Sequence, residues 1–216
     1  MRMRKKPWAK DMIGNRKDCV ISNPSSLKGS WKTFGYDTTV VEIGAGKGDY
    51  WIGMAAKNPA ELWIAVEKNI DAAAMALKKS IDCTRENMKF IVDDADEIDL
   101  WFEAGEVDRI HLNFSDPWPK KAHTKRRLTY GSFLDRYRKV LKQEGCIIMK
   151  TDNARLFEYS LVNFAENGWS LKDVSVDFRR EIHDEDVITE YENSFMQLGQ
   201  PIYRVIFQVP NGESND

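Results

Sequence analysis

Cysteine and histidine are scarce in this chain, which has three of each among its 216 residues. The cysteines lie far apart and include no C-x-x-C pair: Cys19, Cys83 and Cys146. A disulfide framework is therefore not expected, and a reducing compartment such as the cytoplasm fits the chain. The histidines are equally scattered and show no metal-ligand spacing, so we expect no bound metal.

Long apolar runs are also missing. No stretch approaches the roughly 20 apolar residues of a membrane helix, and no apolar region follows the basic start MRMRKK, so neither a membrane anchor nor a secretory signal is expected. The length allows one sizeable core. We therefore expect a single domain at residues 37–210, with a basic arm at 1–36 and a short tail at 211–216.

Charge of one sign is not in excess overall, because the formal net charge is only −2. This balance hides three local segments. Residues 1–17 carry seven Lys or Arg against one acid, and residues 116–142 carry nine against two. Residues 173–193 carry eight acids against two Arg. Because local fields decide which partners bind, the two basic segments leave room for a nucleic-acid partner.

Short apolar runs alternate with helix-like stretches along the chain. The runs predict strands at 38–44, 61–67, 88–93, 109–114, 145–151, 169–178 and 203–209. Helices are predicted at 48–57, 70–81, 97–102, 132–141 and 154–167. This alternation predicts an α/β fold with a doubly wound, mainly parallel sheet of seven strands. The last two strands have no helix of good length between them, which predicts an antiparallel C-terminal strand.

A glycine-rich turn follows the first predicted strand. Its sequence is EIGAGKG at residues 42–48, and Gly44, Gly46 and Gly48 allow a sharp turn and a close approach to a ligand. Glu67 ends the second strand, where a carboxylate accepts hydrogen bonds from a ribose. Ligands of doubly wound sheets bind at this edge, so the turn and Glu67 predict a nucleoside site.

The residues around the turn discriminate between cofactors. The dinucleotide fingerprint G-x-G-x-x-G requires glycine at position 49, where this chain has Asp49. Carboxylates at Glu42 and Asp49 would repel a pyrophosphate, whereas they favour the cationic sulfonium and amino group of S-adenosylmethionine. A carboxylate at Asp94, after the third strand, is placed to accept from an adenine amine. The pattern favours S-adenosylmethionine over a nicotinamide cofactor.

A stiff loop closes the fourth predicted strand. Residues 113–120 read NFSDPWPK, and the two prolines around Trp118 hold Asp116 at the mouth of the expected cleft. The basic run KKAHTKRR follows at 120–127. Cations beside a cleft bind the phosphates of a nucleic acid, and we expect Asp116 and the Trp118 ring to contact one of its bases. The loop therefore predicts a nucleic-acid substrate.

These motifs resemble a known family. Residues 42–48 resemble the first motif of class I S-adenosylmethionine-dependent methyltransferases, and residues 113–130 (NFSDPWPKKAHTKRRLTY) resemble the signature of bacterial tRNA (guanine-N7-)-methyltransferases. The blocks at 150–153, 157–160, 189–192 and 199–204 match as well. The resemblance runs from the first strand to the end of the chain. Three positions depart from the family pattern: Ala45, Ala122 and Gly131.

The resemblance implies a Rossmann-like class I methyltransferase fold, S-adenosylmethionine as cofactor, tRNA as partner and 7-methylguanosine in the variable loop as product. It implies that the cofactor contacts Glu42, Gly44, Gly46, Glu67, Asp94 and Asp116, with Asp116 also catalytic. It implies that the target nucleotide contacts Lys120, Asp152, Thr189, Glu190, Tyr191 and Glu192. It implies that RNA contacts Ala122, His123, Thr124, Lys125, Arg126 and Arg127.

Guanine N7 carries a free lone pair and no proton, so attack on a sulfonium methyl needs alignment rather than a strong general base. We expect Asp152 or Glu192 to accept from guanine N1–H and the 2-amino group. Two alternatives stay open at this point. One is a class I methyltransferase acting on another substrate, and the other is a non-catalytic RNA-binding protein on the same fold. Whether the chain is a monomer or a homodimer is also open.

Overall fold

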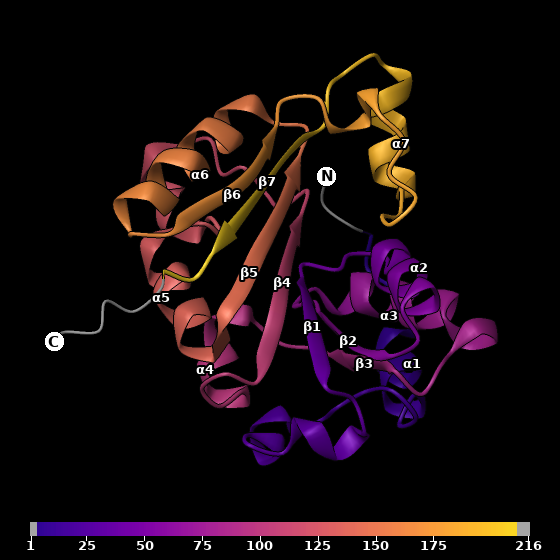
Figure 1. Cartoon of the computed structure of the whole chain (residues 1–216). Coiled ribbons are helices and arrows are strands. Elements are labelled where there is room, and N and C mark those ends of the chain that lie inside the picture. The colour runs from indigo at the N-terminus through magenta and orange to yellow at the C-terminus, as the bar shows by residue number, and fades with distance from the viewer. Residues whose placement is uncertain (1–3, 211–216) are drawn as a thin grey trace, which may run out of the picture.

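Seven strands form one central sheet in the computed structural model, which describes residues 4–210 (Figure 1). The strand order is β3-β2-β1-β4-β5-β7-β6. The strands are β1 Thr38–Ile43, β2 Glu61–Val66, β3 Met88–Ile91, β4 Val107–Asn113, β5 Leu141–Thr151, β6 Ser170–Ser175 and β7 Tyr203–Gln208. β7 runs antiparallel to β5 and β6, and the other pairs are parallel. The predicted fold class is confirmed. The predicted tail at 211–216 lies outside the described residues.

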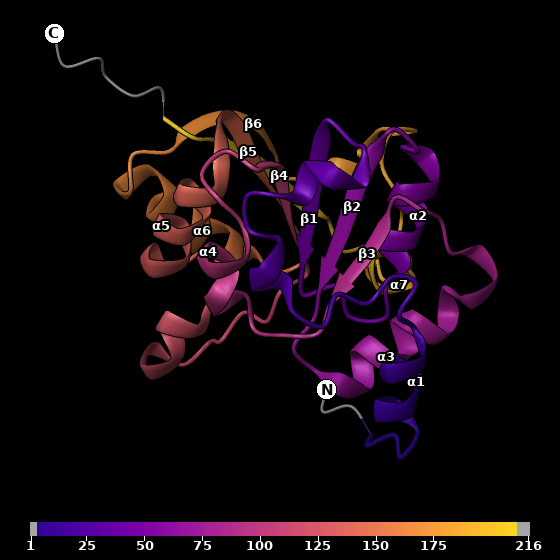
Figure 2. The same cartoon turned by 90° about the horizontal axis from the view of Figure 1, so that it is seen from below.

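Helices cover both faces of the sheet, with α1, α2 and α3 on one face and α4, α5 and α6 on the other (Figures 1 and 2). The helices are α1 Ala9–Asn15, α2 Asp49–Lys57, α3 Ile70–Lys79, α4 Ile98–Trp101, α5 Gly131–Val140, α6 Ala154–Glu166 and α7 Glu190–Gln197. Successive residues of β1 point to opposite faces, so Val40 packs in one buried cluster with Trp51, and Val41 packs in the other with Tyr137. The two clusters form the core on the two faces of the sheet.

Side-chain caps explain where two of the helices begin. The Asn69 side chain accepts hydrogen bonds from the backbone N–H groups of Asp71 and Ala72 at the start of α3. Asn153 accepts from the N–H of Leu156 at the start of α6. Both caps satisfy donors that have no partner inside the helix. They direct each chain away from a strand end, which leaves the carboxyl edge of the sheet open for a ligand.

The C-terminal part of the chain differs from the sequence prediction. The helix α7 lies between β6 and β7, where no helix of good length was expected. Thr189 caps α7 by accepting from the Glu192 N–H at 3.0 Å. β6 covers 170–175 rather than 169–178, and β5 starts at Leu141, where it pairs with Val107 across a register irregularity in β4. The polar residues that follow Leu141 hid this first part of β5 from the hydrophobic pattern.

The N-terminal segment at 4–36 is packed onto the domain. Helix α1 lies against α3. The backbone of Cys19 and Ile21 exchanges hydrogen bonds with Phe90 in β3. The Trp31 side chain is fully buried, and its indole N–H donates to the carbonyl of Trp101 at 2.8 Å. No helix within residues 4–210 is both long enough and apolar enough to cross a membrane.

Candidate active site

Two adjoining cavities open at the sheet edge between β1 and β4, where the strand order changes direction. Their volumes are about 460 Å³ and about 210 Å³. Gly44, Phe114 and Asp116 line both cavities. The structure brings together all six residues that the sequence assigns to the cofactor. The larger cavity is lined by Glu42, Gly44, Gly46 and Asp116, and the smaller by Gly44, Glu67, Asp94 and Asp116.

The glycine turn has the backbone conformation that its sequence predicts. Gly44, Gly46 and Gly48 have φ values of 77°, 55° and 79°, in the region that L side chains rarely adopt. At Gly48 a Cβ would lie 2.8 Å from the Ala76 Cβ, so α3 packs against the turn only because this residue has no side chain. Glu67 fixes the turn, since its carboxylate accepts from the Gly46 N–H at 2.9 Å.

Glu42 presents unpartnered acceptor atoms to the larger cavity. Its Oε1 accepts from Asn113 Nδ2 at 3.1 Å, while Glu42 Oε2 and Asn113 Oδ1 are buried and have no hydrogen-bond partner within residues 4–210. Burial raises the pKa of Glu42 to about 8, although the Asn113 hydrogen bond acts in the opposite direction. Buried acceptors need donors. A cationic amino group is the ligand that fits this pair, and S-adenosylmethionine carries one.

The loop after β4 is strained and braced. Phe114 and Trp118 have φ values of 51° and 42°, which are unusual for residues with side chains and often mark functional sites. The Arg127 guanidinium donates to the carbonyls of Pro117 and Trp118 at 3.0 and 3.1 Å. Arg127, which the resemblance assigns to RNA, is thus engaged within the protein. It holds the loop that carries Asp116.

The basic run forms a 3₁₀ helix at Lys121–Arg126 beside the smaller cavity. Lys120, Lys121 and Lys125 are exposed and form no ion pair with any residue in 4–210. The Arg126 guanidinium lies 5.0 Å from the Trp118 ring centroid and lines the smaller cavity. These positions leave the three lysines free to meet phosphates.

The other residues of this run have smaller roles in the protein itself. His123 packs edge-on against the Trp118 ring at 5.7 Å. Thr124 donates from its hydroxyl to the Lys121 carbonyl at 2.8 Å, which stabilises the 3₁₀ helix. Ala122 is exposed at the surface. The run therefore offers a compact basic edge with an aromatic ring behind it.

Two of the three cations of α5 are paired with acids and do not extend this basic edge, and the third, Arg138, donates to the Asn167 carbonyl. Arg136 and Lys139 form ion pairs with Asp99, and Lys142, just beyond the helix, pairs with Asp108. The count of nine Lys or Arg in residues 116–142 included these cations, and it therefore overstates the positive charge that is free to bind RNA. These charges lie far apart in the sequence, but the fold brings the cations next to Asp99 on α4 and Asp108 at the start of β4, where each charge is neutralised.

The connection between β6 and β7, residues 176–202, supplies the outer wall of the larger cavity. Thr189, Glu190 and Tyr191 line it. The Tyr191 and Phe114 rings meet edge to face at 5.3 Å. Burial raises the pKa of Tyr191, and the negative charges of Asp152 and Asp116 add to the shift, so these three side chains are neighbours. The cavity therefore has an aromatic wall with carboxylates close by.

Three predicted substrate contacts lie outside the cavity linings: Lys120, Asp152 and Glu192. Lys120 is exposed at the rim, and Asp152 is half-buried beside the larger cavity, with its pKa raised by burial. Neither is among the lining residues of the two cavities. Both stay predictions as contacts of a nucleotide that reaches the cavity from outside.

Glu192 is placed differently from its predicted role. The side chain is fully buried, and its carboxylate accepts from Arg179 Nε at 2.7 Å and from Lys150 Nζ at 3.2 Å. It does not line either cavity. Of the two acids predicted to bind the guanine edge, Glu192 is occupied by two ion pairs, whereas Asp152 forms none with any residue in 4–210. Lys150 was missed, although a lysine inside the apolar run GCIIMKT was a visible signal.

Comparisons with known proteins agree with this geometry. The family described as "Putative methyltransferase" matches residues 37–205. The chain is 48% identical over 206 residues to the tRNA (guanine-N(7)-)-methyltransferase of Bacillus subtilis (strain 168), covering 94% of this chain and 97% of that protein. It is 45% identical over 207 residues to the enzyme of the same name from Streptococcus mutans, covering 95% and 98%.

Solved structures share the fold at low sequence identity. The crystal structure of the 16S rRNA methyltransferase KamB matches with a TM-score of 0.63 at 14% identity, over 84% of this chain and 93% of that chain. A 16S rRNA (adenine(1408)-N(1))-methyltransferase mutant from Catenulisporales acidiphilia, solved with its cosubstrate SAM, matches with a TM-score of 0.60 at 11% identity, over 87% and 93%. These neighbours establish the class I methyltransferase fold. From its full-length likeness to the curated enzymes, the chain belongs to the tRNA (guanine-N(7)-)-methyltransferase family.

Proposed function

We propose that this protein transfers the methyl group of S-adenosylmethionine to N7 of a guanine in the variable loop of tRNA and so forms 7-methylguanosine. The observation that carries the proposal is the meeting of two cavities at Asp116 in a chain of this family. The smaller cavity has the acceptors of a nucleoside site and opens beside the basic edge, whereas the larger cavity has an aromatic wall. We place the reaction in the cytoplasm, where tRNA is found.

The cofactor supplies an electrophilic methyl group on a cationic sulfur. In the smaller cavity, Glu67 accepts from the ribose hydroxyls, and Asp94 accepts from the adenine amine. The hydrogen bond that the Glu67 carboxylate accepts from the Gly46 N–H supports this assignment, because it places the carboxylate directly at the glycine turn. In the larger cavity, Glu42 and Asn113 offer their unpartnered oxygens to the amino group. The acids also favour a cationic ligand electrostatically.

The guanine occupies the outer part of the larger cavity. Its N7 lone pair needs no general base, so the protein aligns the base rather than deprotonating it. Tyr191 and Phe114 present ring surfaces against which a base packs. Asp116, at the junction of the cavities, stabilises the positive charge that develops on the purine. Asp152 accepts from N1–H and the 2-amino group and so selects guanine over adenine.

The tRNA backbone lies along the basic edge. Lys120, Lys121 and Lys125 have no counter-ion among the described residues, and they flank the loop that carries Asp116. Phosphates bound there fix the register of the RNA without reading its sequence. The target base leaves its stack in order to enter the cavity, as is usual for enzymes that modify a base.

The test is incubation of unmodified tRNA with S-adenosylmethionine labelled in its methyl group, followed by nucleoside analysis and mapping of the label. We expect label in 7-methylguanosine of the variable loop. Asp116→Ala should abolish transfer without unfolding the protein, because Asp116 is exposed. Asp135→Ala is the matched control, since Asp135 is an exposed acid on α5 far from the cavities. Cofactor binding without transfer to any tRNA would favour a non-catalytic RNA-binding protein instead.

A further inference from the structure

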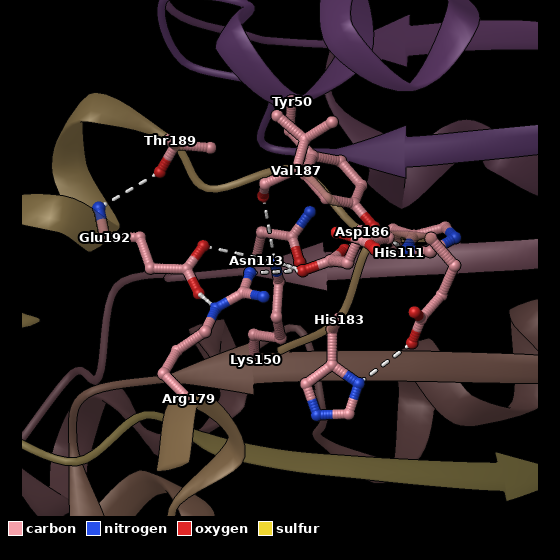
Figure 3. Close-up of polar contacts among 12 residues, drawn as sticks. Tyr50, His111, Asn113, Lys150, Arg179, His183, Asp186, Val187, Thr189 and Glu192 are labelled. Carbon is pink, nitrogen blue, oxygen red and sulfur yellow. Dashed lines mark hydrogen bonds and ion pairs between the residues drawn. The ribbon is translucent and has the colours of Figure 1, made fainter. Parts of the chain in front are cut away.

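Four charged side chains form a closed buried group behind the wall of the larger cavity (Figure 3). Lys150 comes from the end of β5, whereas Arg179, Asp186 and Glu192 all come from the β6–β7 connection. Lys150 and Glu192 are 1% and 0% exposed, and the side chains of Arg179 and Asp186 are 6% and 9% exposed. The group therefore carries two positive and two negative charges, almost out of contact with water.

Each charge in the group contacts both charges of opposite sign. Lys150 Nζ lies 2.6 Å from Asp186 Oδ2 and 3.2 Å from Glu192 Oε2. Arg179 donates from Nε to Glu192 Oε1 at 2.7 Å, and it also pairs with Asp186. Lys150 Nζ is the only one of the four charges that the sheet contributes. Since a buried charge without its partners is costly, the group holds the connection against β5.

A second arm of the network reaches the other half of the sheet. Tyr50, on α2, donates its hydroxyl to Asp186 Oδ1 at 2.8 Å, and His111 Nδ1 lies 3.1 Å from the same hydroxyl (Figure 3). Because the Tyr50 hydrogen goes to Asp186, His111 Nδ1 carries a hydrogen and donates. Burial lowers the pKa of His111 to about 3, so its ring is neutral. Asp186 is thereby linked to both β4 and β5.

The remaining ties between the connection and α2 or the glycine turn are few. Lys57 Nζ donates to the Asp184 carbonyl at 2.6 Å, and Val187 packs where a Cβ on Gly53 would stand. Lys47 and Glu190 form an exposed ion pair at 3.8 Å, a kind of pair that contributes little. Figure 1 shows the connection reaching from the tops of β6 and β7 over to α2. The buried network is thus its main polar anchor.

We propose that Lys150 is a positioning residue: through Asp186, Glu192 and Arg179 it sets the place of the β6–β7 connection and hence the cavity wall that receives the guanine. The inference rests on the proposed function. It concerns a residue that lines neither cavity itself, although Lys150 contacts the lining residues Tyr50 and Phe114. The wall residues Thr189 and Tyr191 follow directly on Asp186 and Val187 in the chain, so a shift of the network moves them.

The test compares Lys150→Met with the wild-type chain. We expect kcat/KM for tRNA to fall about 30- to 100-fold, because a wall displaced by about 1 Å misaligns the base. The fall should lie mainly in kcat, and hydrogen exchange in residues 179–192 should accelerate. The affinity for S-adenosylhomocysteine should stay within about threefold, since Glu42, Glu67 and Asp94 are not on the connection. Lys89→Met is the matched control, because Lys89 is also a buried strand lysine but lies on β3.

A second variant separates positioning from plain stability. Lys150→Met leaves one unbalanced negative charge, and adding Glu192→Gln restores neutrality with Arg179 and Asp186 still paired. We expect the double variant to regain thermal stability, while its kcat and its exchange rate in 179–192 stay as in Lys150→Met. Recovery of kcat together with stability would overturn the inference. Lys150→Arg keeps the charge and should restore part of the activity.

A milder variant covers the case in which Lys150→Met does not fold. Tyr50→Phe removes one hydroxyl and should lower kcat about three- to tenfold, with faster exchange in 179–192. Wild-type activity and exchange in Tyr50→Phe would count against the network. No methyl transfer by the wild-type chain would refute the proposed function itself. Equal transfer by the wild type and a folded Lys150→Met would overturn only the present inference.

Discussion

The environment of Glu42 predicts that ligand binding and proton binding are coupled at this residue. The carboxyl is buried beside the larger cavity, its pKa is raised to about 8, and Oε2 has no hydrogen-bond partner among residues 4–210. At pH 6.5 the free protein therefore holds a proton on this group. A cationic amino group favours the ionised form, so its arrival lowers the pKa of Glu42 and expels the proton.

We expect S-adenosylmethionine binding at pH 6.5 to release about one proton. Calorimetry in two buffers of different ionisation enthalpy measures this number directly. Glu42→Gln should abolish the release and weaken binding about tenfold or more, because a neutral amide attracts the amino group less. A proton release of zero in the wild type would remove Glu42 from the amino-group site.

Glu42 also makes the stability of the free protein depend on pH. Its pKa is about 8 when folded and 4.5 when exposed. Between these values the folded state holds a proton that the unfolded state has lost, so the free energy of unfolding falls as pH rises through this window. Glu42→Gln should flatten this part of the profile in urea titrations at pH 5, 6.5 and 8. An unchanged slope in the variant would show that other groups cause it.

Arg127 holds the loop that carries Asp116, and we predict that its effect on activity comes through this loop. Its guanidinium bridges the Pro117 and Trp118 carbonyls and lies 4.2 Å from the Tyr159 ring centroid. Arg127→Lys keeps the charge but loses the two-pronged geometry, so kcat should fall about 10- to 100-fold.

The salt dependence of tRNA binding should not change in Arg127→Ala, which removes the charge, because no phosphate contact is lost. Arg126→Ala is the comparison variant, since the Arg126 guanidinium is exposed. Its slope of log K against log salt should become less steep by about 0.7 to 0.9. A less steep slope in Arg127→Ala would return this residue to the RNA interface.

At the scale of elements, the parallel core was predictable and the C-terminal connection was not. Each core strand is a short apolar run bounded by turns, and each is buried on both faces, as for β2. The hydrophobic pattern did not predict helix α7, because the buried residue of this helix is the charged Glu192 and its aromatic Tyr191 is half-exposed. Hydrophobic periodicity does not detect a helix that is held by an ion-pair network.

The same limit applies to charge counting. A tally along the chain treats the basic run and the cations of α5 alike, although Arg136 and Lys139 of α5 have counter-ions and the lysines of the basic run have none among residues 4–210. The acidic segment at 173–193 likewise contains Asp173, Asp186 and Glu192, which pair with buried or partly buried cations. The pairing partners come from distant elements, so a single sequence does not contain this information.

Two triple variants should separate these groups of cations. Replacing Lys120, Lys121 and Lys125 with Ala should make the salt slope of tRNA binding less steep by about 2 to 3. Replacing Arg136, Lys139 and Lys142 should leave the slope unchanged and lower stability by at most about 1 kcal/mol per pair, as for other partly exposed pairs. Filter binding across a salt series measures the first effect, and urea unfolding measures the second. Equal slopes in the two variants would contradict the assignment of the basic edge.

At the scale of the whole molecule, the cofactor residues were predictable because strand ends converge. Glu42 lies near the carboxyl end of β1, and Glu67 and Asp94 follow β2 and β3. The carboxyl ends of these parallel strands meet at one edge. The buried network was not predictable, because Lys150 and Asp186 are joined only through the path of the β6–β7 connection. Topology places residues near strand ends, whereas long connections are placed by packing.

The N-terminal segment decides where the folding unit begins. The sequence predicts an arm at 1–36 and a domain at 37–210, but residues from the first range complete the core. Trp31 is fully buried and stacks on Phe102 at 4.8 Å. Residues 19–21 cover the edge of β3 through hydrogen bonds with Phe90. Without them, the sheet has a bare edge and a hole of indole size.

We therefore expect a fragment of residues 37–210 to fail to fold, because losing one buried Trp alone costs about 3–5 kcal/mol of a total near 5–15 kcal/mol. Circular dichroism and urea unfolding of the fragment provide the measurement. Deleting only residues 1–5 is the matched control, since α1, Cys19 and Trp31 all stay in place, and its stability should change by less than about 0.5 kcal/mol. A cooperative unfolding transition in the 37–210 fragment at wild-type stability would show that the segment is an appendage. If the 37–210 fragment shows no unfolding transition and the chain without residues 1–5 shows a normal one, the folding unit starts between residues 6 and 37.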